Sequence, residues 1–497
     1  MFKRNASGLV KALKMRDVFI YNSLTISLFS MMWFLLFIFQ PVAFTGGSIV
    51  LGTALLAIVA VPFFITYSYL SRAYPLAGGD YIFQSRTMHP VVGFVFTFTG
   101  WVLWQLFFIA WFGYYIVDAL LLPYLYFMSK LTGSWVFLSM YGVMNSRYFV
   151  FFATAILLAI AFLISMRGLR FYVKVQYLIF ILMVAGGVSA LAILFGHDSY
   201  HVISAAASLG SLGSINWLNT IGTWSLSWGA VGYGMWSVLN NEEISGSESR
   251  KKYSAAMVGA VLLNVFYVVA VWVGLKAAVG YAQLSQLSQL WYSGRLTGML
   301  ATVGAPYYTV LMAFLNPNPI LYTVLIVGAA VSMFQVMIAI MIGSSRIVLA
   351  QSLDGILPIK LATVQDRSHS PIYSLAFDLF ISMIWLVLIV FMPSIGPFFV
   401  SVVFATQVTW MFSMISGMIK AKRERNPGIL IASAIGFLLN AVIAAFYIIY
   451  PQLGFMSITS MLVVSGLFAV AFIYFAARNL YLKRKTGFTI KDRVKEL

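Results

Sequence analysis

Twelve long apolar stretches run through this chain, and they restrict its fold more than any other feature. A helix needs about 20 apolar residues to cross a bilayer. Of the 497 residues, 62% are hydrophobic and 9% are charged, which is typical of an integral membrane protein and not of a soluble one. We therefore predict an all-α polytopic membrane protein with twelve transmembrane helices. The stretches lie at roughly 18–44, 48–70, 91–125, 148–166, 170–195, 217–240, 254–279, 319–344, 373–392, 396–419, 428–450 and 457–477.

The distribution of Lys and Arg predicts the orientation in the cytoplasmic membrane. Alternate segments between the stretches carry 27 of the 31 Lys and Arg residues. The positive-inside rule places these segments, and with them both termini, in the cytoplasm. An even number of spans independently requires the termini to share a side. The net charge of +18 is therefore explained by topology and by contact with membrane lipid, and no nucleic-acid partner is predicted.

Residues 228–236 read WGAVGYGMW, and Ala230 to Gly234 differ in one letter from the TVGYG filter of potassium channels. Gly234 lies eight residues before Glu242, or about 12 Å along a helix, near the middle of a core of roughly 30 Å. A potassium filter lies near the outer face and needs four copies around one axis. Two interpretations stay open: a helix broken beside a cavity, and close packing of small residues.

Three stretches together resemble the amino acid–polyamine–organocation (APC) superfamily of permeases. The first, at 67–100, reads YSYLSRAYPLAGGDYIFQSRTMHPVVGFVFTFTG. The second, at 232–252, reads GYGMWSVLNNEEISGSESRKK and contains paired glutamates before a basic cluster. The third, at 344–375, reads SSRIVLAQSLDGILPIKLATVQDRSHSPIYSL. They occur in the order that the family has, across most of the chain.

The resemblance implies a leucine-transporter-like fold built from a 5+5 inverted repeat. The first repeat would cover 18–195 and the second 217–420, with two further helices at 428–477. A cytoplasmic segment, 1–17, would precede them and a basic cytoplasmic tail, 478–497, would follow. The implied function is secondary-active transport of amino acids by alternating access, either proton-coupled or by exchange. A polyamine or organic-cation exchanger and a transport-inactive amino-acid sensor are the alternatives.

The resemblance places the substrate between the broken first and sixth helices. This chain departs from the family in its first span, because 18–44 contains no glycine and SLFSMMWF (27–34) replaces the usual Gly-Ser-Gly break. The three serines Ser23, Ser27 and Ser30 share one helix face, where they either line the site or bond back to their own helix. The substrate-binding candidates are Ser27, Ser30, Met31, Trp228, Gly232, Tyr233, Gly234 and Trp236.

Three residues are candidates for coupling transport to an ion. Some relatives have a lysine midway along span five, but this chain has apolar residues there. Span eight lacks the adjacent Ser/Thr pair of sodium-coupled relatives and offers Ser332 and Gln335. Asp378 lies seven residues after Pro371, about 10 Å into span nine, where it would either relay a proton or pair with a nearby base.

Two further features concern the outer face. Asp118 falls 28 residues after Pro90, about 42 Å along a continuous helix, where it would attract cationic substrates or be solvated. The stretch 281–318 is long for a loop and is predicted to act as a gate. No Walker loop, zinc-ligand cluster or nucleophile elbow occurs, so we expect neither enzymatic chemistry nor a cofactor or metal.

Overall fold

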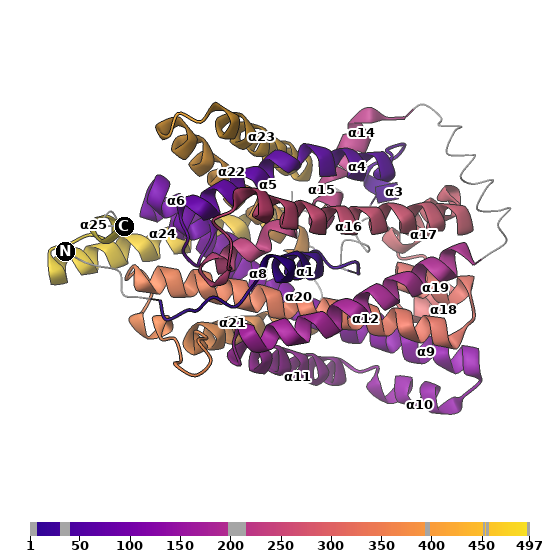
Figure 1. The fold of residues 1–497 in the computed structure, drawn as a ribbon. Coiled ribbons are helices and arrows are strands. Elements are labelled where there is room, and N and C mark those ends of the chain that lie inside the picture. The colour runs from indigo at the N-terminus through magenta and orange to yellow at the C-terminus, as the bar shows by residue number, and fades with distance from the viewer. Residues whose placement is uncertain are drawn as a thin grey trace.

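A computed structural model describes residues 7–29, 40–196, 215–392, 398–450, 453 and 457–494. Within these ranges all regular elements are helices, and the β-structure is limited to two isolated β-bridges. Most of the long helices run along one common direction, and both termini lie at the same end of the bundle (Figure 1). We call this the terminal end, and the other the far end.

Ten helices in the described ranges are long and apolar enough to cross a membrane, and each overlaps one of the predicted stretches. This confirms an all-α protein with multiple candidate spans. They are α4–α5 (Ile49–Ala73), α7–α9 (Pro90–Thr132), α11 (Arg147–Met166), α12 (Leu169–Phe195), α16 (Arg250–Ala278), α20 (Pro319–Leu353), α21 (Ile372–Phe391), α22 (Phe398–Arg423), α23 (Pro427–Ile449) and α24 (Ile458–Thr486).

The two remaining predicted stretches, 18–44 and 217–240, consist of shorter pieces in the described residues. The first contains α1 (Met15–Ile26) and α3 (Gln40–Ala43). The second contains α14 (Trp217–Gly222), α15 (Trp224–Ser227), the 3₁₀ turn η4 (Trp228–Ala230) and the 3₁₀ helix η5 (Gly232–Glu243). Twelve transmembrane helices and the inverted repeat therefore stay predictions.

The second of the ten spans is longer than the predicted 91–125 and is not uniform. The α-helical pieces α7 (Pro90–Thr97), α8 (Trp104–Tyr115) and α9 (Leu122–Thr132) are joined by π-helical turns at η2 (Phe98–Leu103) and η3 (Ile116–Leu121). Such turns widen a helix locally and often occur at functional sites.

Short helices connect the spans at both ends. Among them α19 covers the segment that follows α1, because the Phe29 ring stacks on Tyr308 with 6.2 Å between the ring centroids. This contact lies within the stretch predicted to be a gate, which stays a prediction. The connecting helices are α6 (Asp80–Thr87), α10 (Trp135–Met144), α17 (Tyr281–Tyr292), α18 (Gly298–Thr302), α19 (Tyr308–Leu315) and η6 (Ile359–Ala362). A further short helix, α25 (Ile490–Val494), follows the last span.

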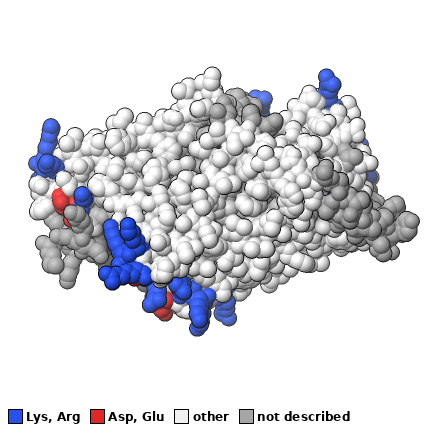
Figure 2. Space-filling model, turned by 90° about the horizontal axis from the view of Figure 1, so that it is seen from above, with Lys and Arg blue, Asp and Glu red and all other residues white. Residues whose placement is uncertain are grey.

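The surface separates charged ends from an apolar middle. Figure 2 shows Lys and Arg side chains gathered toward the half that holds both termini, while the broad middle of the visible face is almost free of charge. Large apolar side chains are exposed along the outward faces of α11 and α24, such as Phe152 and Phe472. Exposed apolar side chains along helices of this length suit contact with lipid chains.

Candidate functional site

The helix α1 ends at Ile26 although no glycine is present to end it. The next residue, Ser27, has φ 57°, a left-handed conformation that is uncommon and costly for a residue other than glycine. The Ser27 hydroxyl accepts a hydrogen bond from the Phe29 backbone N–H at 3.1 Å and donates one to Ser332 on α20 at 3.0 Å. These bonds hold the break in place, so the first span is interrupted without the glycines of the family.

The predicted serine stripe has two different roles. The Ser23 hydroxyl bonds back to the carbonyl of Phe19 at 2.8 Å, as expected for a structural serine, whereas Ser27 reaches another helix. Ser30 and Met31 lie outside the described residues.

The break in the sixth stretch lies at Val231, which has φ −122° and ψ −58°. The two glycines after it serve close packing. A Cβ added to Gly232 would lie 2.5 Å from the Trp228 ring, and one added to Gly234 would lie 2.5 Å from Val261. Both interpretations of the Gly-Tyr-Gly sequence therefore apply here. The helix is interrupted, and its glycines fit against bulky neighbours.

A cavity lies where the two breaks meet. It is small in this conformation, with about 20 Å³ open to a water-sized molecule. Residues from four places line it: the end of α1, the middle helix α8 of the span Pro90–Thr132, the segment η4–η5, and α20. The lining residues are Thr25, Ile26, Gln105, Phe108, Phe112, Gly229, Tyr233, Trp236, Val336 and Ile340.

The polar atoms of this central cavity are few. The Thr25 hydroxyl already donates to the carbonyl of Tyr21 at 2.7 Å. The Gln105 amide nitrogen donates to Thr406 at 2.9 Å, but its amide oxygen has no hydrogen-bond partner among the described residues. The Tyr233 hydroxyl lies near Gln105 and Thr406 and makes no hydrogen bond of good geometry with either. Two polar groups are thus available to a ligand in an otherwise apolar cavity.

The three aromatic candidates belong to one buried cluster. Tyr233 and Trp236 lie with ring centroids 5.5 Å apart and both line the central cavity. Trp228 is not among the lining residues and packs at 5.7 Å against Trp410 of α22. The cluster also contains Phe63 and Trp101. Trp228 therefore supports the cavity wall from behind.

Sequence reasoning missed most of the cavity lining. It did not single out Gln105, Phe108 or Phe112, which all lie on α8. The signal available was Gln105, a polar residue in the middle of an apolar stretch. Nothing in the sequence distinguishes Val336 and Ile340 from the other apolar residues of their helix.

The coupling candidates lie in three separate places. Ser332 contacts Ser27 at the break in α1. The Gln335 amide donates to the Tyr172 hydroxyl and so joins α20 to α12. Asp378 on α21 is fully buried, and neither of its carboxyl oxygens has a hydrogen-bond partner in the described part of the chain. Of the two alternatives for Asp378, pairing with a base is not seen among the described residues, and a role in proton relay stays a prediction.

Asp118 does not reach the central cavity. It lines a second, outer cavity of about 830 Å³ toward the far end, together with Trp111, Tyr114 and Arg147. The acidic residue that was predicted to attract cations thus has a basic residue on the same wall.

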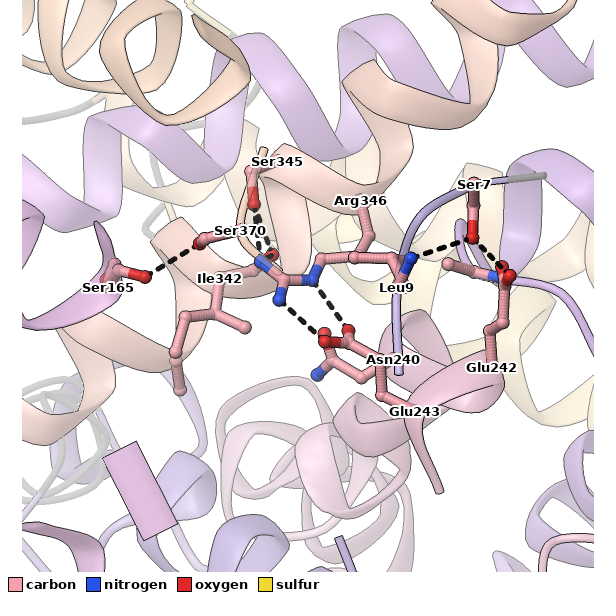
Figure 3. Close-up of polar contacts among 12 residues, drawn as sticks. Ser7, Leu9, Ser165, Asn240, Glu242, Glu243, Ile342, Ser345, Arg346 and Ser370 are labelled. Carbon is pink, nitrogen blue, oxygen red and sulfur yellow. Dashed lines mark hydrogen bonds and ion pairs between the residues drawn. The ribbon is translucent and has the colours of Figure 1, made fainter. Parts of the chain in front are cut away.

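The stretches that carry the resemblance meet at the terminal end. The guanidinium of Arg346 on α20 binds the carboxylate of Glu243, at the end of η5, through Nε at 2.8 Å and Nη2 at 3.0 Å (Figure 3). Both side chains are buried, at 1% and 2% exposure. Arg86 likewise donates two hydrogen bonds to the carboxylate of Asp354, from Nη1 at 2.8 Å and from Nη2 at 2.9 Å. Bidentate Arg–carboxylate pairs combine strength with a defined geometry.

The N-terminal segment closes over this network. The backbone N–H groups of Ala12 and Leu13 donate to the Glu243 carbonyl at 2.8 Å and 3.0 Å. Ser7 donates to the carboxylate of Glu242, the neighbouring acid (Figure 3). The terminal end of η5 is therefore held both by the Arg346–Glu243 ion pair and by hydrogen bonds from the N-terminal segment that leads into α1.

Asp80, between the first two of the ten spans, is a further buried carboxylate. One oxygen accepts hydrogen bonds from Tyr67, at 2.6 Å, and Ser413, and the other has no partner among the described residues. Within the described part of the chain, no cation forms a salt bridge with it. Burial raises the pKa of Asp80 from 3.8 to about 6.

This raised pKa predicts a dependence of stability on pH. The folded protein binds the Asp80 proton more tightly than the unfolded chain does, so the stabilisation is complete below about pH 4 and is lost as the pH rises through about 6. The loss is on the order of 3 kcal/mol for a shift of about two pKa units. Asp80→Asn should remove this dependence, and thermal unfolding of both proteins in detergent at pH 4 and pH 7 measures it. An equal dependence in the variant would assign it to another group.

Two interrupted helices that meet beside a cavity inside a polytopic helical bundle define a class of membrane transport protein. A family model described as "Amino acid permease" matches residues 19–477, so the chain belongs to this family, within the APC superfamily. No curated protein matches the chain. Its family and its ten long apolar helices support an amino acid transporter, with a small molecule such as an amino acid as substrate.

Proposed function

We propose that this protein is a secondary-active transporter that moves amino acids across the cell membrane by alternating access, with both termini in the cytoplasm. The central cavity carries this proposal. It lies where the interruptions of α1 and of the sixth stretch meet, and two helices of the other spans complete it. Inside a membrane, unwound backbone is tolerated only where it is buried in protein or lines a cavity.

The substrate ammonium would bind at the end of α1. The carboxyl end of a helix carries a partial negative charge from its unpaired carbonyl groups, and α1 ends at the cavity wall with Ile26. Carbonyl groups around Gly232 to Gly234 would contribute further acceptors. Ser27, which follows the end of α1, would form the adjoining wall.

The character of the cavity wall favours an amino acid with an uncharged, mainly apolar side chain. Among the described residues, none of those that line the central cavity is Asp, Glu, Lys or Arg. A polyamine or organic cation would leave its second charge without a partner there, which is costly in an apolar site. Gln105 and Tyr233 offer two hydrogen-bonding groups, and Trp236 would close one side of the pocket.

Counterflow in proteoliposomes tests this proposal directly. We expect saturable counterflow of one or more neutral apolar amino acids, and at least a tenfold loss in Gly232→Leu, because the new side chain would collide with Trp228 beside the cavity wall. The control is Gly466→Leu, since a Cβ at Gly466 on α24 meets nothing within 4 Å.

The alternatives give different results in the same assay. Counterflow of polyamines but not of amino acids would favour the cation exchanger. Binding of an amino acid by the purified protein without any counterflow would favour the sensor. A Gly232→Leu variant that transports at the level of Gly466→Leu would contradict the proposed site.

A further inference from the structure

Asp378 is the most isolated acidic side chain that the structure describes. It lies on α21, is fully buried, and both of its oxygens lack a hydrogen-bond partner in the described ranges. One turn further on the same face, the hydroxyl of Ser382 also lacks a partner. A buried carboxylate without a partner costs several kcal/mol, and such groups inside membrane helices are often functional.

The helix α21, which carries Asp378, packs against α8, α11, α20 and η6. Among these, α20 carries a buried charged residue, Arg346. Ionisable residues of the other three elements lie near the far end or on the surface: Tyr114, Tyr115, Arg147, Tyr148 and Lys360.

Arg346 is already engaged by another acid. Its Nε and Nη2 atoms bind Glu243, and Nη1 donates to the Ser345 hydroxyl at 3.1 Å. Of the buried carboxyl groups on the helices that pack against α20, Glu243 is thus paired with Arg346, whereas Asp378 has no partner among the described residues. The Arg346–Glu243 pair joins α20 to the end of η5, which is kinked at Asn240 (φ −101°, ψ 23°) just before Glu243. Short 3₁₀ segments often mark hinges.

We propose that Asp378 is the proton-binding site of the transport cycle, and that its ionised carboxylate competes with Glu243 for Arg346. When the O–H bond of the Asp378 carboxyl breaks, the proton passes to water that enters from the terminal end. Arg346 then turns toward the new carboxylate and Glu243 is released. The end of η5 is freed, and the terminal end opens toward the cytoplasm. This inference rests on the proposed transport function.

Proton binding would in this way be linked to the closed terminal end. The protonated carboxyl leaves Arg346 to Glu243 and keeps η5 attached to α20. Since linkage is reciprocal, opening of the terminal end weakens proton binding by the same factor. A proton taken up from the outer side would therefore be discharged on the cytoplasmic side.

Thiol labelling tests the opening step without any transport measurement. The chain has no cysteine, so a single introduced thiol is labelled without background. Ser247, in the turn after η5, is 6% exposed and should become accessible to a maleimide when this end opens. The exposed Ser245 provides the matched control, because Ser245→Cys reports how pH alone changes thiol reactivity.

We expect the labelling rate of Ser247→Cys, divided by that of Ser245→Cys, to rise at least about threefold between about pH 6 and pH 8. In the Asp378→Asn background, which imitates the protonated carboxyl, this ratio should stay low and flat. In the Glu243→Gln background it should be high at both pH values. Ser382→Ala, one turn from Asp378, should behave as the unaltered chain. A pH-dependent ratio that persists in Asp378→Asn overturns the proposal.

Transport separates failure of this inference from failure of the proposed function. Asp378→Asn should retain counterflow, at a reduced rate, and lose the stimulation of uptake by an inward proton gradient. If the unaltered chain shows no counterflow of any amino acid, the proposed function fails. If it transports and Asp378→Asn still responds to the gradient, only the assignment of the proton site fails.

Discussion

Arg346→Ala is expected to destabilise the protein by about 3–5 kcal/mol. Removal of one partner from a buried ion pair leaves the other charge buried and unpaired, and this cost exceeds the net value of the pair itself. Glu243 is 2% exposed, and both of its carboxylate oxygens accept hydrogen bonds from Arg346. Chemical unfolding in mixed micelles, followed by tryptophan fluorescence, measures the loss.

Two controls distinguish this loss from a general effect of removing a charge. Lys420→Ala breaks a pair with Glu424 whose side chains are 25% and 46% exposed, and should change stability by less than about 1 kcal/mol. The double change Arg346→Met with Glu243→Leu removes both charges and should recover most of the stability. Stability of Arg346→Ala within about 1 kcal/mol of the unaltered chain would show that water reaches Glu243.

Gly328→Leu is expected to prevent correct packing of α12 against α20. A Cβ at Gly328 would lie 2.7 Å from the Cα of Gly186 and 2.7 Å from the carbonyl oxygen of Leu182. These are backbone atoms of the facing helix, so no side chain can rotate away and the two helices must separate. The cost should exceed the roughly 1–3 kcal/mol of ordinary overpacking in a core.

The yield of monodisperse protein in detergent, measured by size-exclusion chromatography, tests this prediction. Gly466→Leu places the same side chain on α24, where a Cβ meets nothing within 4 Å, and should leave the yield unchanged. If Gly328→Leu gave the same yield as Gly466→Leu, the prediction would be contradicted, because the two helices would then separate at little cost.

The sequence predicts the spans well because a membrane helix is specified locally. A run of about 20 apolar residues has to satisfy its own backbone hydrogen bonds in lipid, and only a helix does this within one segment. Ten predicted stretches accordingly coincide with long helices. The ends were less accurate. The predicted 91–125 extends to Pro90–Thr132, and 319–344 extends to Leu353, because these helices continue beyond their apolar runs.

The candidate site was only partly predictable. The glycines at 232 and 234 and the aromatic residues beside them marked the interrupted sixth stretch. The interruption of α1 carried no such mark, because Ser27 adopts a left-handed conformation that sequence statistics assign to glycine. Hydrogen bonds to Ser332 and Phe29 hold this conformation, and the first of these partners is remote in the sequence.

The sequence by itself determined that the chain is helical, apolar and related to the APC superfamily, and it predicted from the basic residues which ends of the helices share a side. Those properties depend on composition and on residues that are close together along the chain. Only the tertiary structure decided that Gln105 and Tyr233 line one cavity, that Arg346 binds Glu243, and that Asp378 has no hydrogen-bond partner among the described residues. Each depends on which side chains of distant helices face one another, and the pattern of a single helix does not specify its neighbours.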